Sequence, residues 1–223
     1  MGEAPEQVTN TYTTGIKLFK TNENDVKLTG AEFQITGENM VVVLVSGDVF
    51  VEDAGGTYYK LNNGSYTETV PNQSNESEYA STTTKYIKTT INNTDMDSSS
   101  VDVRAFVDEN GYLTFEGLGE GTYTIEEVTV PVGYNKAANT VVTIEWNPEA
   151  VDPAKMWTAT VGGEPLAFND GEGVFDLTIK NQSGSELPST GGMGTTIFYI
   201  VGGALVLFAV VLLVTKKRMK DAQ

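Results

Sequence analysis

Three polar residues of complementary chemistry, Lys20, Glu127 and Asn181, stand where an alternating apolar pattern calls for a buried side chain. Alternate residues of a β-strand point to the same face, so the residue type at every second position shows which face enters the core. The preceding residues of the same phase are apolar in all three runs: Ile16 and Leu18 before Lys20, Tyr123 and Ile125 before Glu127, and Phe175, Leu177 and Ile179 before Asn181.

These three residue types together can form an amide bond between side chains. Burial lowers the pKa of a lysine, which favours a neutral amine that can attack an amide carbon. A buried glutamate can hold a proton for the asparagine carbonyl and for the departing ammonia. The product would be an intramolecular isopeptide bond between Lys20 and Asn181, formed once per chain, with Glu127 in a catalytic role. The alternative is that each strand ends there and its last inward residue reaches solvent.

The elements that must position these residues are strands. Residues 12–182 alternate short runs rich in Val, Ile, Thr, Tyr and Phe with Gly, Asn and Asp turns, and no long stretch has helical periodicity. The pattern predicts an all-β sandwich with a long polar insertion at about residues 55–100, in which 85–91 forms a short strand. The other expected strands are 15–21, 31–36, 40–45, 49–53, 58–61, 101–107, 112–118, 121–128, 139–146 and 174–181.

Composition excludes several classes of function. The chain has no Cys and no His, which removes disulfides, thiol chemistry, zinc sites and histidine-based acid–base catalysis. After Gly191 there are four basic residues and one acidic residue, so residues 1–190 keep 10 basic and 29 acidic groups, a net charge of −19. A body this acidic is not expected to bind nucleic acid, because phosphate binding needs clustered Lys and Arg. The sequence indicates no cofactor and no metal site.

The C-terminal region has the pattern of a membrane anchor. Residues 195–214 contain no charge, and a helix of that length spans about 30 Å, the thickness of a bilayer core. The basic tail at 215–223 predicts a cytoplasmic end and an external body. The first residues lack the apolar region of a signal peptide, so we interpret 1–11 as a trimmed or engineered start or as a linker from a missing upstream domain.

Several stretches resemble the collagen-adhesin B-type (Cna B-like) domains of Gram-positive pilins and adhesins, an Ig-like sandwich family. They are "KTNENDVKLTGAEFQI", "FEGLGEGTYTIEEVTVPVGY" and "LTIKN". The resemblance implies that a lysine of the first strand joins an asparagine of the last strand, assisted by a glutamate of the Y-x-I-x-E segment. These roles fall on Lys20, Asn181 and Glu127. Val130 stands where the family usually has Ala, and the resemblance is weak across residues 50–100.

The linker at 183–194 contains "LPSTG", which resembles the LPxTG signal cleaved by sortase, a membrane-bound transpeptidase. The motif consists of Leu187, Pro188, Ser189, Thr190 and Gly191. The apolar span and basic tail that follow make the match specific. The resemblance implies cleavage between Thr190 and Gly191 and transfer of the Thr190 carboxyl to an amine of another pilin subunit or of a peptidoglycan cross-bridge. The membrane would hold the chain only before sorting.

The sequence therefore predicts a non-enzymatic, sortase-anchored subunit of a Gram-positive pilus or pilus-like fibre on the cell wall. Two alternatives remain open. One is a stand-alone anchored adhesin that binds a host ligand through its 55–100 insertion. The other is a single-pass receptor that keeps its membrane span. "DENG" at 108–111 resembles part of a calcium loop, but it fits a hairpin turn better. No acceptor lysine motif is present.

Overall fold

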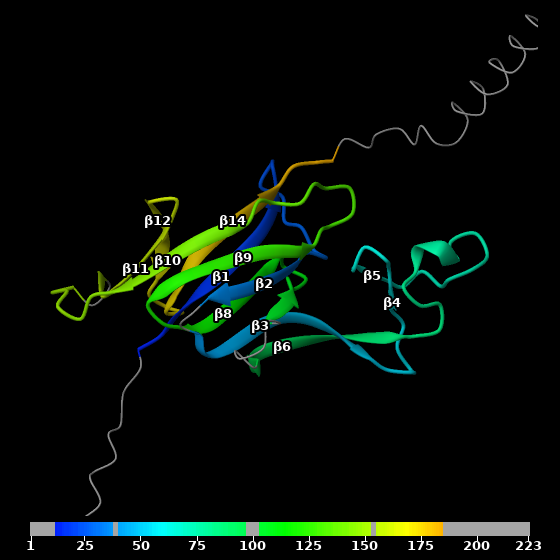
Figure 1. The fold of residues 1–223 in the computed structure, drawn as a ribbon, viewed down its shortest axis with the longest axis horizontal. Helices are drawn as coiled ribbons and strands as arrows, with labels where there is room; N and C mark the ends of the chain where they lie inside the picture. Colours follow the sequence, from blue (N-terminus) through cyan, green and yellow to red (C-terminus); the bar gives the residue numbers. More distant parts are fainter. Residues whose placement is uncertain (1–11, 38–39, 97–102, 153–154, 185–223) are drawn as a thin grey trace, which may run out of the picture. The chain divides into compact units, whose positions relative to one another are not determined.

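The structure is a computed structural model that describes residues 12–37, 40–96, 103–152 and 155–184. These residues fold into strands with one short 3-10 helix (Figure 1). The elements are β1 (Thr14–Asn22), β2 (Glu32–Gly37), β3 (Met40–Glu52), β4 (Tyr59–Lys60), β5 (Tyr66–Thr67), η1 (Glu76–Glu78), β6 (Tyr86–Met96), β7 (Arg104–Phe106), β8 (Tyr112–Leu118), β9 (Gly121–Thr129), β10 (Thr140–Trp146), β11 (Trp157–Val161), β12 (Glu164–Pro165), β13 (Ala167–Asn169) and β14 (Val174–Asn181).

All strands except β4 and β5, which pair only with each other, form one continuous hydrogen-bonded path that folds back on itself as a sandwich. Its order is β12-β11-β10-β9-β2-β7-β3-β8-β1-β14-β13, with β6 added to β3. The two halves of the path meet at β7 and β3 through a single residue pair, Asp48 with Phe106. At the other side, β12 and β13 are separated only by Leu166, whose N–H donates to the Ala159 carbonyl at 2.8 Å. The all-β sandwich prediction is confirmed.

The first and last strands are direct neighbours. β1 and β14 run parallel, paired from Gly15 with Val174 to Asn22 with Asn181, and β8 flanks β1 on its other side. Both strands alternate buried and more exposed residues, so their apolar phase fills the space between the sheets. The core contains Ile16, Leu18, Phe33, Ile35, Val45, Leu113, Phe115, Tyr123, Ile125, Val142, Ile144, Phe175, Leu177 and Ile179.

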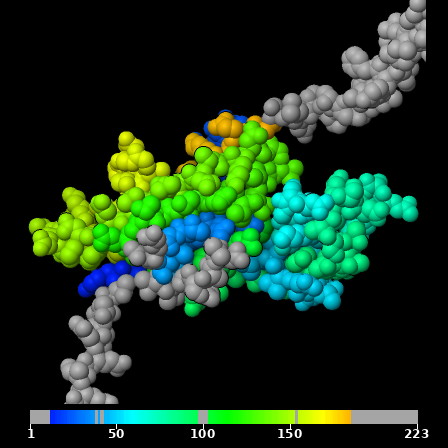
Figure 2. Space-filling view, viewed as in Figure 1, coloured from blue at the N-terminus to red at the C-terminus, as the bar shows by residue number. Residues whose placement is uncertain are grey.

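The insertion is more ordered than a surface loop. β6 is 11 residues long and pairs with β3, which is itself one continuous strand where two were expected. β4, β5 and η1 form a lobe at the far end of this ribbon, and Figure 2 shows the lobe, in cyan and teal, beside the sandwich. Its root packs through aromatic rings, with Phe50 stacked on Tyr66 at 4.0 Å between ring centroids and edge-on to Phe106 at 5.1 Å.

Candidate functional site

Lys20 lies on the inward face of β1 with no exposed surface, as its strand phase predicts. Its ammonium group donates to three acceptors: the Asn181 Oδ1 at 2.7 Å, the Ile179 carbonyl at 3.0 Å and the Thr21 carbonyl at 3.3 Å. Three acceptors match the three protons of an ammonium group. The charged form is therefore hydrogen-bonded although it is buried.

Asn181 reaches Lys20 diagonally across the parallel pair. The strand register places Asn181 opposite Asn22 and Lys20 opposite Ile179. The Lys20 side chain therefore extends to the next inward-facing residue of β14, two positions further along, to reach the amide. Asn181 is fully buried, like Lys20, although the two residues are 161 positions apart in the chain. Parallel pairing of the two terminal strands is therefore what brings them together.

Glu127 faces this pair from the opposite sheet. It lies on β9, is 1% exposed, and accepts the Asn181 Nδ2 through both oxygens at 2.9 and 3.1 Å. Its Oε1 is 3.9 Å from the Lys20 Nζ. The backbone N–H of Ala137 donates to Oε2 at 2.8 Å and fixes the carboxylate in place. One carboxylate thus contacts the amide nitrogen of Asn181 and lies within reach of the lysine amine.

Burial is the main electrostatic influence on the lysine. It lowers the pKa of Lys20 to about 8, because leaving water disfavours the charged form, and the charge of Glu127 opposes this change. A lysine with this pKa carries a neutral-amine fraction near neutral pH that an exposed lysine lacks. The cluster can therefore supply a nucleophile, an amide carbon and a proton carrier without solvent access.

A set of contacts around the C-terminal end of β14 was not predicted from the sequence. The N–H of Asn135 donates to the Gln182 carbonyl at 2.9 Å, and the N–H of Gly184 donates to the Gly133 carbonyl at 2.8 Å. Glu23 accepts the N–H and hydroxyl of Ser183 at 3.2 and 2.5 Å. The loop that fixes Glu127 through Ala137 thus also holds the chain just after Asn181. The only sequence signal was the "PVGY" turn, whose contacts cannot be read from its composition.

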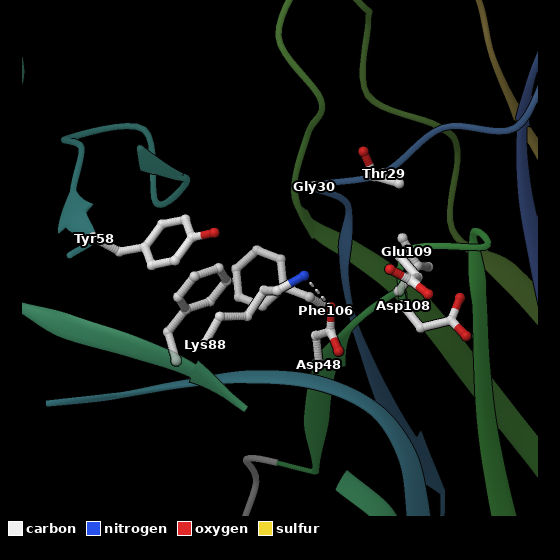
Figure 3. A pocket seen from close by; sticks show the side chains of 10 residues that line it. Thr29, Gly30, Asp48, Tyr58, Lys88, Phe106, Asp108 and Glu109 are labelled. Carbon is white, nitrogen blue, oxygen red and sulfur yellow. Dashed lines mark ion pairs between the residues drawn. The ribbon is translucent and has the colours of Figure 1, made fainter. Parts of the chain in front are cut away.

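A second polar feature lies at the root of the insertion. A pocket of about 260 Å³ is lined by Asp48, Phe50, Tyr58, Lys88, Phe106, Glu109 and neighbouring residues (Figure 3). The buried Asp48 carboxylate accepts the Thr90 hydroxyl at 2.6 Å and pairs with the Lys88 Nζ at 3.1 Å. Its charge is satisfied within the protein, so the pocket has a mixed aromatic and polar lining without an unpaired buried charge.

The turn at 108–111 is used structurally. The Asp108 Oδ1 accepts the backbone N–H groups of Asn110 and Tyr112, both at 2.8 Å, and Gly111 has a positive φ of 83°. In the part of the chain that the structure describes, no group of three or more acidic side chains is placed to hold a metal ion. The geometry at 108–111 is that of a tight turn, in which Asp108 satisfies the backbone.

The predicted sorting motif at 187–191, the span at 195–214 and the tail at 215–223 lie outside the described residues. Within the described stretches, none of the elements is a helix of the length and hydropathy needed to cross a bilayer.

Comparison with known families identifies two segments. Residues 87–155 match the SpaA prealbumin-like fold domain, and residues 179–221 match the LPXTG cell wall anchor motif. The first segment contains Glu127, and the second contains Asn181 and "LPSTG". No match is found among curated protein sequences.

Solved structures with similarity include pilus proteins. The C-terminal domain of shaft pilin SpaA from Lactobacillus rhamnosus GG is 15% identical, with 78% of this chain and 99% of that chain covered and a TM-score of 0.35. The pilus 2b backbone protein of group B streptococcus is 18% identical, with 85% and 48% covered and a TM-score of 0.37. The longer SpaA shaft pilin is 16% identical, with 79% and 48% covered and a TM-score of 0.37. This chain spans about half the length of these two longer proteins.

The anchor motif places the protein on the cell wall of a Gram-positive bacterium. The all-β architecture agrees with the prealbumin-like domain that the central segment matches. The chain is a cell-wall-anchored surface protein in which residues 87–155 are similar to the SpaA prealbumin-like fold domain.

Proposed function

We propose that the protein is a structural subunit of a pilus or pilus-like surface fibre, attached through Thr190 by sortase and stabilised by an isopeptide bond between Lys20 and Asn181. The observation that carries this proposal is the buried cluster in which the first strand, the last strand and Glu127 meet. A fibre subunit transmits tension from one end of its chain to the other, and a bond between its terminal strands serves that need.

The bond forms by replacement of ammonia. Glu127 takes a proton from the Lys20 ammonium, and the neutral amine attacks the Cγ of Asn181. Glu127 then passes its proton to Nδ2 and takes the second proton from the attacking nitrogen. The C–N bond of the original amide breaks, and the departing ammonia takes this proton from Glu127 to leave as ammonium. The net change is one secondary amide formed and one ammonium released. Enforced proximity in such a site can supply about 7–11 kcal/mol of the barrier.

Intact mass tests the bond. We expect residues 1–190 to be short by one ammonia, and the variants Lys20→Ala and Glu127→Ala to have their full mass. Lys17→Ala and Glu126→Ala are matched controls, because both residues lie on the same strands as the site but form exposed ion pairs with Glu172 and Lys136. Both controls should keep the mass deficit. A wild-type chain of full mass would refute the cross-link.

Sortase dependence tests the attachment separately. We expect wall extracts to contain the protein in high-mass ladders that disappear on deletion of the sortase or on Thr190→Ala substitution. A single wall-linked species of monomer size would argue against polymerisation and favour a stand-alone anchored protein, even if the isopeptide bond forms.

A second candidate function is adhesion to a host ligand through the insertion. The ordered lobe and the pocket at its root favour it, since the pocket has aromatic walls and polar groups of both charges. The N–H of Asp53 donates to the Lys85 carbonyl at 3.0 Å, so a two-residue Asn-Gly turn in place of residues 54–84 would close the ribbon without the lobe. Loss of host-cell binding in this variant, with the isopeptide bond retained, would support adhesion.

A further inference from the structure

β6 is an unusual edge for this sandwich. The other outer strands, β12 and β13, have two and three residues, and β12 ends in Pro165. β6 has 11 residues and pairs with β3 on one side. On its other side, only Tyr86 has a described strand partner, Tyr58. Figure 1 shows β6 as the outer strand of the ribbon. A long free edge is a template for another strand.

The sequence of this edge has little protection against pairing. Residues 87–95 contain no Pro or Gly and only two charges, Lys88 and Asp95. Edge strands commonly use Pro, short length or unpaired charge to block association. Lys88 pairs with Asp48 of the same chain at 3.1 Å, which reduces its repulsion of another strand, but its side chain is still 36% exposed and can also contact a carboxylate of a partner. Side chains from 87 to 95 are exposed except for Ile91, so they do not occupy a core of their own.

The backbone direction identifies the free groups. The N–H and C=O of Tyr86 bond to Tyr58, on the side away from β3. Alternate residues of a strand direct their backbone groups the same way, so Lys88 and Thr90 also direct theirs to the open side. The register then shifts by one residue, from Gly47 opposite Ile91 to Val45 opposite Thr94, which marks a bulge. After the bulge, the backbone N–H and C=O of Asp95 point to the open side, away from β3.

We propose that β6 is a docking edge for β6 of a second copy of this chain. In an antiparallel pair with Lys88 opposite the partner's Asp95, both residues direct their backbone groups to the interface. The same register places Thr89 opposite the partner's Thr94. The two-fold symmetry of the pair makes each of these contacts occur twice. Opposite charges and Thr–Thr pairs are favourable cross-strand neighbours. The edge is therefore self-complementary at both ends of this register, where Lys88 and Asp95 can pair by charge and by backbone hydrogen bonds.

This interface joins neighbouring subunits laterally. Each contact is small, but subunits tethered to one wall have a high effective concentration, so weak pairing is sufficient. The net charge of the body opposes association over long distances. At about 0.15 M salt the screening length is about 8 Å, so the local Lys88–Asp95 pairs outweigh distant repulsion.

Cysteine cross-linking tests the register. The chain has no native Cys, so Thr89→Cys/Thr94→Cys in residues 1–190 introduces the only two thiols; this length keeps every contact described above. The two positions lie about 17 Å apart along one strand, too far for a disulfide within a chain. We expect oxidation to give a covalent dimer. The single-cysteine variants are the controls and should cross-link only at the slower rate of random collision.

Charge reversal tests the partner pairing. Asp95→Lys in the double-cysteine background should slow cross-linking about fivefold or more, because Lys88 would then face a second positive charge on the other copy. Glu145→Lys, an equal charge change on exposed β10, should leave the rate unchanged. The proposal is overturned if the double-cysteine variant links no faster than the single variants. It is also overturned if both charge reversals act equally.

Discussion

Removing the proposed cross-link without leaving a buried charge should lower the melting temperature strongly. The variant is Lys20→Met/Glu127→Gln, in which Met approximates the length of Lys and Gln the shape of Glu. Both charges leave together, because removing one partner of a buried ion pair costs about 3–5 kcal/mol through the charge left behind. The remaining difference from wild type then reports mainly the covalent link.

The size of the effect follows from the position of the link in the chain. The two residues of the proposed link are 161 positions apart, and loop-closure entropy for that length corresponds to about 5 kcal/mol. A domain of this size changes its melting temperature by about 2–4 °C per kcal/mol. We therefore expect the variant to melt about 10–20 °C below the linked wild type in differential scanning calorimetry of residues 1–190.

The matched control is Lys17→Met/Glu126→Gln, which makes the same residue changes at neighbouring positions. Lys17 and Glu126 form exposed pairs with Glu172 and Lys136, and exposed pairs contribute about 0–1 kcal/mol each. The control should keep the bond and melt within a few degrees of wild type. If mass spectrometry shows the wild type to be linked and the core variant still melts within about 3 °C of it, the loop-closure reasoning is wrong.

Three further outcomes follow from the same geometry. Asn181→Asp should still link, now by loss of water, and reach the mass of linked wild type; a mass one water higher would contradict the mechanism. When unlinked inclusion-body protein is refolded, the rate of bond formation should be independent of pH from about 6 to 7.5, because transfer of a proton from Lys20 to Glu127 leaves the number of protons on the pair unchanged. Above the Lys20 pKa of about 8 the pair loses this proton, and the rate should fall about tenfold per pH unit. A rate that rises up to pH 8 would instead show that Lys20 must first lose its proton to solvent. Gly47→Ala should lower the free energy of unfolding by about 1–3 kcal/mol in urea titrations, because the added Cβ would lie 2.6 Å from a carbonyl oxygen of β7. The control Gly171→Ala should have little effect, because its Cβ would have no contact closer than 3.4 Å.

Strand phase carried most of the information about the site. Lys20, Glu127 and Asn181 are each 1% exposed or less, at the inward positions that a period of two predicts. The sequence could not show that they touch, because contact depends on parallel pairing of β1 with β14 and on the opposite sheet. The N–H of Ala137 on Glu127 was also beyond prediction, since any non-proline residue supplies such a donor.

The strands that were missed are short or mixed in pattern. The sequence predicted no strand between 139–146 and 174–181, where the structure has β11, β12 and β13. Among the residues of β11 only Ala159 is fully buried, so the apolar alternation there is weak. Gly162 and Gly163 both have positive φ, at 59° and 90°, as a two-residue hairpin turn requires. That dipeptide was the available signal. β6 exceeded its predicted length because its Thr and Asn residues pair with β3 while remaining exposed.

The parallel arrangement of β1 and β14, together with the proposed bond, determines how the domain should respond to force. Force applied at the two ends of the domain pulls β1 toward Thr14 and β14 toward Asn181, so tension enters at Thr14, runs along β1 to Lys20 and leaves through Asn181. The 160 residues between Lys20 and Asn181 then lie outside the loaded path. In single-molecule stretching, the linked chain should show no unfolding step. The Lys20→Met/Glu127→Gln chain should unfold and lengthen by roughly 500 Å, which is the extended length of those residues at about 3.3 Å each minus the distance that they span when folded. A step of that length in a chain proven to be linked would mean that the bond joins other residues, and equal behaviour of both chains would mean that the cluster does not carry the load.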